Sequence, residues 1–177
     1  VLADAAGVVE ASVPPFGAVW PELAGLAAPA DALQGEPARQ RWLAWAAELG
    51  RESGKTAPKA ADAVVDAWAV ADPAERLRLL RKAFFVADED RLNKNLQKFP
   101  VAQAAEEELQ RLCVADRQHT AWLHQQRLAR LTRCLLAEYA ALKRTRGWVD
   151  MNDIERAAGV LLADPVLSGW VQERLDA

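Results

Sequence analysis

Residues 101–146 read VAQAAEEELQRLCVADRQHTAWLHQQRLARLTRCLLAEYAALKRTR, with no glycine and no proline. Apolar residues recur in this stretch at spacings of 3, 4, 4 and 3, the period of an amphipathic α-helix, at Leu128, Leu131, Leu135, Tyr139 and Leu142. At a rise of 1.5 Å per residue, one helix over the stretch would reach about 69 Å, so a bend or a break into two helices is an alternative. Gly147 is the expected stop. The stretch predicts one long amphipathic helix packed on shorter helices.

The rest of the 177 residues carries start and stop signals for shorter helices. Proline or aspartate stands where a helix would begin, and glycine or proline where one would end. The composition has a single isoleucine and is 51% hydrophobic, which favours helix over sheet. We therefore expect an all-α fold, with at most a minor strand near 84–86. The expected helices cover residues 3–12, 20–28 (after a turn at 14–17), 37–49, 58–71, 73–84, 151–163 and from 165 onward.

The domain organisation is expected to be a single helical domain over residues 1–177, with a second candidate boundary in the polar segment 85–100. The chain begins at Val1 rather than methionine and ends in a helical pattern, so we expect a fragment of a larger protein. It shows neither a signal peptide nor an apolar run long enough for a membrane span. A cytoplasmic location without a membrane partner is the expectation.

Two tempting motifs fail on spacing. Gly54-Lys55-Thr56 resembles the end of a Walker A loop, but the required first glycine is replaced by Leu49, and a helix rather than a strand is predicted before it. We interpret it as a surface loop between helices. The two cysteines and two histidines lie in the predicted long helix without the i,i+3 or i,i+4 spacing of metal ligands, so we expect no metal, no disulfide and no cofactor in this chain. These residues are Cys113, His119, His124 and Cys134.

A basic segment is the strongest functional signal. Residues 117–146 hold seven basic residues and one acidic residue, in a chain whose net charge is −3. At about 100° per residue, His119, Trp122 and several polar or basic residues fall opposite the leucines. Cations beside an aromatic ring suit a nucleic-acid backbone with a base to stack; the alternatives are a solvated helix face, or Trp122 packed under another helix. The candidate DNA-binding residues are Trp122, Gln126, Arg130, Arg133, Lys143, Arg144 and Arg146.

The stretch LAEYAALKRTRGWVDMNDIE, residues 136–155, with the pair Leu161-Leu162, resembles part of the UvrD/Rep-type superfamily 1 DNA helicases. Their pattern there reads roughly Y-x-x-x-K-x-x-x-G-x-[LV]-D-[FM]-x-D-[LI], and Asn152 departs from a common acid. Gly54-Lys55-Thr56 before an alanine-rich helix, and residues 83–86, look more like the helicase–nuclease subunits AddA and RecB.

The resemblance implies accessory subdomain 1B, a helical insertion that guides DNA through the motor, just before the D-E-x-Q-D motif. The fragment would catalyse nothing. ATP, Mg²⁺, helicase activity and any exonuclease activity would belong to the rest of a repair and recombination enzyme. The partners would be DNA, the rest of the motor and a second helicase–nuclease subunit. The alternative is a helical protein-interaction or subunit-docking module without a DNA role, suggested by the tryptophan-rich, acidic first half of the chain.

Overall fold

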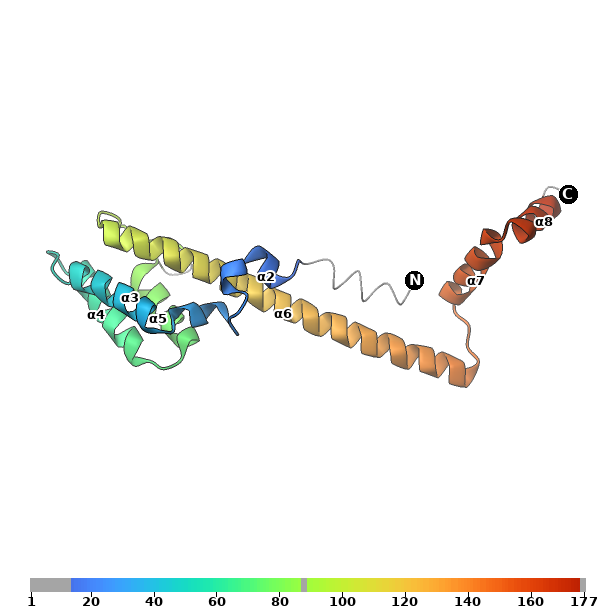
Figure 1. Ribbon diagram of the computed structural model, residues 1–177, viewed down its shortest axis with the longest axis horizontal. Coiled ribbons are helices and arrows are strands. Elements are labelled where there is room, and N and C mark those ends of the chain that lie inside the picture. The colour runs from blue at the N-terminus through green and yellow to red at the C-terminus, as the bar shows by residue number, and fades with distance from the viewer. Residues whose placement is uncertain (1–13, 87–88, 176–177) are drawn as a thin grey trace. The chain divides into compact units, whose positions relative to one another are not determined.

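The regular structure of the chain is helical, as predicted (Figure 1). The computed structural model describes residues 14–86 and 89–175, and within them the β-structure is an isolated antiparallel bridge between Phe85 and Leu92. This bridge lies where a minor strand was expected. The helix predicted over residues 3–12 lies outside the described residues.

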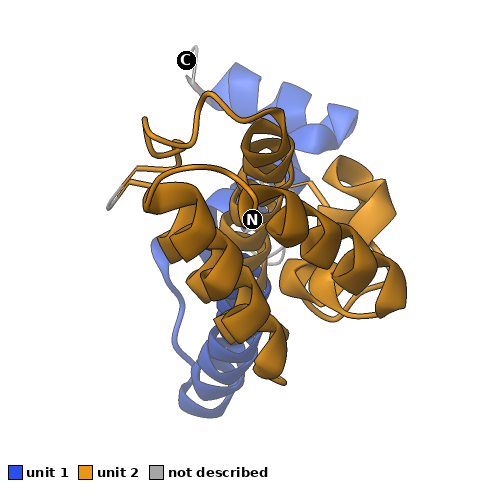
Figure 2. Cartoon of the chain, turned by 90° about the vertical axis from the view of Figure 1, so that its left-hand side faces the viewer, with its two compact units in different colours: residues 1–13, 124–177 blue, residues 14–123 orange. Residues whose placement is uncertain are grey.

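The chain divides into two compact units, residues 14–123 and a second unit of residues 1–13 and 124–177 (Figure 2). We call residues 14–123 the core unit and the described residues 124–175 the tail unit. The polar segment 85–100, the candidate sub-boundary of the expected single domain, lies inside the core unit. The division falls between Leu123 and His124, within a single helix.

The core unit is built from helices that begin where the sequence signals them. Asp72 accepts a hydrogen bond from the Ala74 amide and Pro73 follows it, so the start of α5 is capped. Figure 1 shows α3, α4 and α5 gathered beside the first part of α6. The elements are α2 (Phe16–Val19), 3₁₀ turns at Pro21–Leu23 and Pro29–Leu33, α3 (Glu36–Leu49), α4 (Thr56–Ala69), α5 (Pro73–Phe84) and the first half of α6 (Pro100–Arg146).

Two of the sequence-based predictions for the N-terminal part of the core unit are wrong. Residues 14–17, expected as a turn, lead directly into the short helix α2. Residues 20–28, expected as a helix, form only the 3₁₀ turn Pro21–Leu23. Pro21 stands at the first position of the turn, which suits a helix start, but Gly25 follows shortly after the turn and weakens any continuation as a helix.

A large aromatic centre holds the core unit together. Trp42 of α3 is fully buried, and its ring lies 5.0 Å from that of Trp45 and 5.8 Å from those of Trp68 and Phe84. The buried positions of α4 are mostly alanines, such as Ala60, which let neighbouring helices approach closely. These tryptophans are core residues, the alternative that the sequence left open.

Arg76 of α5 is buried, and among the residues that the structure describes no carboxylate pairs with it. Its guanidinium donates hydrogen bonds to the carbonyl oxygens of Ala67, Leu33 and Val70, at 3.3, 2.8 and 2.6 Å. It also lies 5.2 Å from the centre of the Trp68 ring. The Ala67 carbonyl also accepts from the Val70 amide, so the arginine adds to the end of α4 and ties α5 both to that end and to the 3₁₀ turn Pro29–Leu33.

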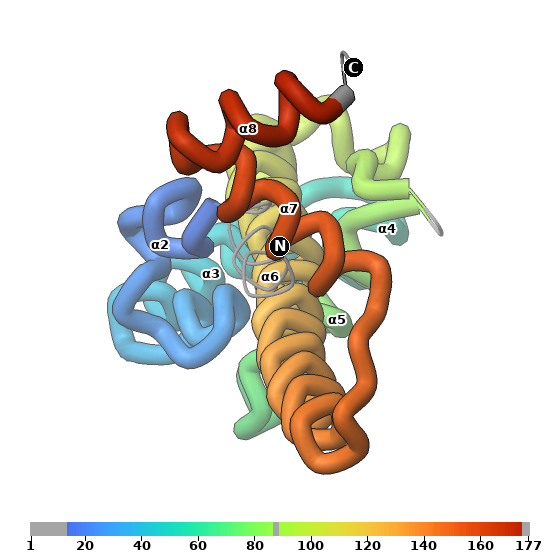
Figure 3. The backbone as a smooth tube through the Cα atoms, turned by 90° about the vertical axis from the view of Figure 1, so that its right-hand side faces the viewer, coloured from blue at the N-terminus to red at the C-terminus, as the bar shows by residue number. Residues whose placement is uncertain are grey.

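The tail unit contains the rest of α6, followed by α7 (Met151–Ala163) and α8 (Pro165–Leu175) (Figure 3). Helix α6 is continuous over its whole length. It ends at Gly147, whose φ of +65° is the left-handed conformation that glycine favours, with a hydrogen bond from the Trp148 amide to the Lys143 carbonyl. Asp150 then caps α7, as predicted.

The tail unit has almost no core of its own. Among its residues whose burial the structure describes, only Ala129 is buried. In the described part of the chain, none of the helices combines the length and the apolar character needed to cross a lipid bilayer.

Candidate nucleic-acid interface

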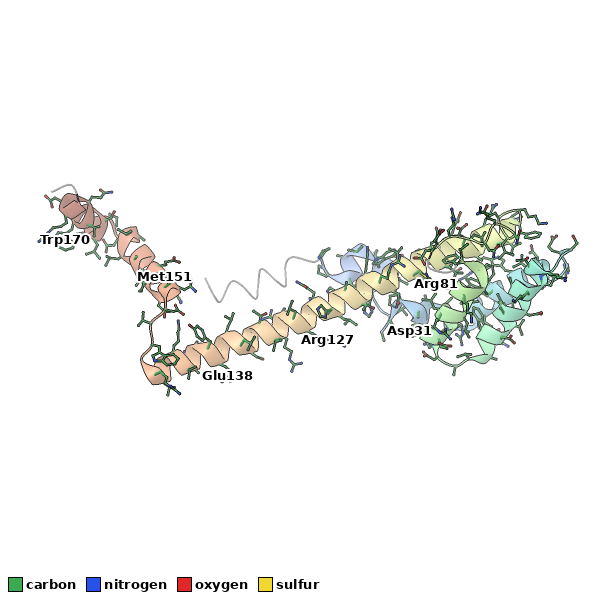
Figure 4. The ribbon with its side chains drawn as sticks, turned by 180° about the vertical axis from the view of Figure 1, so that it is seen from behind. Asp31, Arg81, Arg127, Glu138, Met151 and Trp170 are labelled. Carbon is green, nitrogen blue, oxygen red and sulfur yellow. The ribbon has the colours of Figure 1, made fainter. Side chains whose placement is uncertain are left out.

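The seven candidate DNA-binding residues all lie on α6, but the structure gives them different environments. Trp122 belongs to the core unit and the other six to the tail unit. Figure 4 labels Arg127 and Glu138 on this half of α6 and shows side chains projecting from both sides of the helix. The candidates therefore have to be judged one by one from their contacts.

The aromatic end of the predicted stripe is part of a small core. His119 is 9% exposed, and its ring lies 4.8 Å from that of Phe16 and 5.9 Å from that of Trp122. Trp122 is half-buried against Phe16, with ring centres 6.4 Å apart. The expectation of an open ring for base stacking at Trp122 is corrected here, because that ring packs on α2.

Lys143 is held by carboxylates. Its ammonium donates to the Asp150 carboxylate at 3.0 Å and to the Asp153 carboxylate at 2.5 Å, and its side chain is only 11% exposed. The Tyr139 hydroxyl donates to the same Asp150 oxygen at 2.8 Å. Two carboxylates facing one ammonium make this corner acidic, so Lys143 is removed from the candidate interface and acts in the α6–α7 connection.

These hydrogen bonds shift the acid–base equilibria of the corner. Donation from Lys143, and then from Tyr139, lowers the pKa of Asp150 to about 2. The same ammonium lowers the pKa of Asp153, and this contact raises the pKa of Lys143. Donation to Asp150 raises the pKa of the Tyr139 hydroxyl. All four shifts favour the charged carboxylates and the protonated donors, so the corner is fully formed at neutral pH.

The remaining candidates lie at the surface. Arg130, Arg133 and Arg144 are exposed, and Gln126 is half-buried. Arg146 is exposed and its guanidinium lies 5.2 Å from the centre of the Trp148 ring, which is itself 54% exposed. Arginine stacked on an open indole leaves its outer edge available to an anion or a base.

The first half of α6 packs on the shorter helices, as predicted, whereas the leucine side of its second half is largely exposed. Leu131 and Leu135 are 54% and 60% exposed, and the other three members of the series are 40–42% exposed. The spacing predicted an amphipathic helix, and that helix forms. No described part of the tail unit buries the apolar side of α6, whereas the core unit buries Trp42 completely.

The other sequence motifs lie in a surface loop and along α6. Gly54-Lys55-Thr56 leads from the loop after α3 into α4 and is mostly exposed, as expected of a surface loop. Cys113 is buried, Cys134 is exposed, and both are free thiols on α6. Burial raises the pKa of the Cys113 thiol to about 11. The described residues contain no group of three or more His, Cys, Asp or Glu side chains arranged to hold a metal.

Sequence reasoning missed a second group of basic residues, in the core unit. Lysines from α4, α5 and the segment before α6 lie around two adjoining pockets. They come from three separate segments, so no linear spacing announces them. The only signal was that the core unit has no lysine outside this group, which consists of Lys55, Lys59, Lys82, Lys94 and Lys98.

Comparison of the chain with protein-family models, with curated proteins and with solved structures finds no match in any of the three.

Proposed function

We propose that this chain is a DNA-contacting accessory region, of the 1B type, in a larger ATP-dependent DNA helicase of the UvrD/Rep type, related to the AddA/RecB-like helicase–nuclease subunits. Its role is to guide DNA through the motor. ATP and Mg²⁺ would be bound elsewhere in the enzyme. The residues proposed to meet DNA are the exposed arginines of the tail unit, and Arg130 and Arg144 are central among them.

One observation carries the proposal: α6 has two different exposed sides in the tail unit. Leu131 and Leu135 lie on one side, and at about 100° per residue Arg130 and Arg144 lie opposite them. An apolar side suits packing against the rest of a protein, and a basic side suits phosphates. A helix that docks by one side and presents cations on the other can guide DNA. The resemblance of residues 136–155 to the helicases supports the same assignment.

DNA binding by the whole chain tests this proposal. Non-specific binding of single-stranded DNA is expected in the range of about 10⁻⁴–10⁻⁶ M. Replacing both Arg130 and Arg144 by glutamine should weaken it several-fold and lower the slope of log affinity against log salt by about 1.4, since each phosphate contact on a single strand contributes about 0.7.

The matched control removes two exposed arginines from the core unit, Arg39→Gln with Arg111→Gln. Fluorescence anisotropy of a labelled oligonucleotide at several salt concentrations measures all three proteins. Equal slopes for the wild type and the tail-unit variant would contradict the proposal.

The second candidate function is a subunit-docking module without a DNA role. The exposed apolar side of α6 favours it, together with Val160, Val166 and Trp170, which are 72%, 79% and 56% exposed in α7 and α8. The tryptophans of the first half do not support it, because Trp42 is buried in the core and Trp45 and Trp68 pack against that core. If the chain binds no DNA and Leu131→Gln with Leu135→Gln abolishes co-purification with the rest of its enzyme, this second function is the correct one.

A further inference from the structure

The five lysines of the core unit meet around two adjoining pockets at the start of α4. The larger pocket, about 540 Å³, is lined by Lys55, Lys59 and Lys82. The smaller, about 360 Å³, is lined by Lys55, Lys94 and Lys98. Lys55, Thr56 and Asn95 line both pockets, so the two form one basic depression.

These lysines differ from the arginines of the same unit in their partners. All five are exposed, and none of them has an ion pair with a described residue. Arg39, Arg78 and Arg111, by contrast, each pair with a glutamate. Residues 14–123 contain sixteen acidic and fourteen basic residues, so the depression is a local basic patch on an acidic unit. One carboxylate, that of Asp66, lines the larger pocket.

The groups lining the depression suit phosphate oxygens. Lysine ammonium groups bind phosphates as point charges, and the Thr56 hydroxyl and Asn95 amide can add hydrogen bonds. No side chain caps the start of α4, whose first amides therefore add partial positive charge. The aromatic residue at the smaller pocket, Phe99, is only 8% exposed and offers little ring surface for stacking a base.

We infer that this lysine depression binds the phosphate backbone of duplex DNA without reading its bases. A duplex fits better than a single strand because its phosphates face outward while its bases are already stacked and paired. The inference takes its ligand class, DNA, from the proposed function. Its residues are different and lie in the other unit.

The test compares matched variants of the whole chain. One replaces Lys55, Lys59 and Lys94 by glutamine, and the control replaces Arg39, Arg78 and Arg111 by glutamine, so both lose three positive charges at exposed sites. The lysine variant should bind duplexes of unrelated sequence about tenfold more weakly, with a salt slope lower by about 2.7, because each duplex phosphate contact contributes about 0.9. The control should lose far less. Equal losses in the two variants would overturn the inference.

A second measurement locates the contact. Acetylation of lysines, read by mass spectrometry, should be slowed by duplex DNA at the five lysines and unchanged at Lys143, whose ammonium is held by Asp150 and Asp153. If duplex DNA does not slow acetylation of the five core-unit lysines, the inference is overturned. This holds even if the variant lacking Arg130 and Arg144 binds DNA more weakly, as the proposed function expects. If the lysines are protected and the variant binds DNA as tightly as the wild type, the inference is upheld and the proposed contact of Arg130 and Arg144 with DNA is rejected. Displacement of the duplex by an equimolar amount of inorganic triphosphate would also overturn it, since the depression would then hold a small anion.

Discussion

The core unit and the tail unit share the same helical periodicity but differ in what covers their apolar sides. In the first half of α6, Leu109 and Leu112 are fully buried against α3, α4 and α5. In the second half, Leu131 and Leu135 follow a similar spacing and are more than half exposed. The difference teaches that periodicity specifies which side of a helix is apolar, whereas burial depends on a partner elsewhere in the chain or in another protein.

The largest expected effect separates two tryptophans. Trp42→Ala should destabilise the chain by about 3–5 kcal/mol, because it empties a fully buried aromatic centre. The matched change Trp148→Ala removes a ring that is 54% exposed, and it should cost no more than about 1 kcal/mol, including its contact with Arg146. Urea unfolding followed by far-UV circular dichroism measures both. Similar costs would mean that the tail unit has a core as consequential as that of the core unit.

The next effect tests the buried arginine. Arg76→Met keeps an unbranched apolar stem but removes the guanidinium that donates to the carbonyls of Leu33, Val70 and Ala67. We expect a loss of about 1–3 kcal/mol, the usual cost of leaving buried polar groups unpaired. The control, Arg78→Met, removes an exposed partner of Glu75 and should change stability little. A neutral Arg76→Met would show that these carbonyls reach water.

A pH dependence is expected at the α6–α7 corner. The pKa of Asp150 is lowered to about 2 in the folded chain, against about 3.9 for an ordinary aspartate. The folded form therefore gains stability from ionised Asp150 above about pH 4, and that gain disappears as the pH falls toward 2. Carbon-13 titration of the Asp150 carboxyl should show the low pKa, and Lys143→Met should raise it. Arg144→Met, the control, should leave it unchanged.

The smallest effect is expected on the leucine side of α6. Leu135→Gln should change the free energy of unfolding by no more than about 0.5 kcal/mol, because this side chain is 60% exposed. Leu109→Gln on the same helix places an amide in a dry core and should be strongly destabilising. A large loss from Leu135→Gln in the isolated chain would show that a partner already covers this side, such as a second copy.

The sequence showed which residue types the candidate site contains, but not which neighbours those residues contact. The sequence placed the cations on the long helix that the structure contains, and the Asp150 cap of α7 rests on a local hydrogen bond from the Asp153 amide. It could not foresee that the Lys143 ammonium would turn to both carboxylates, since this depends on the chain reversal at Gly147. The packing of Trp122 on Phe16 was equally hidden, because the two residues are far apart in sequence.

The sequence by itself determined the longer helices of this protein. Proline, aspartate and glycine act within a turn or two of their own position, so the starts of α5 and α7 and the end of α6 follow from local hydrogen bonding. Only the tertiary structure decided that Trp42 is buried, that five scattered lysines share one depression and that Leu131 and Leu135 of α6 face outward. Burial and the gathering of charge depend on contacts between segments distant in sequence, which no local pattern records.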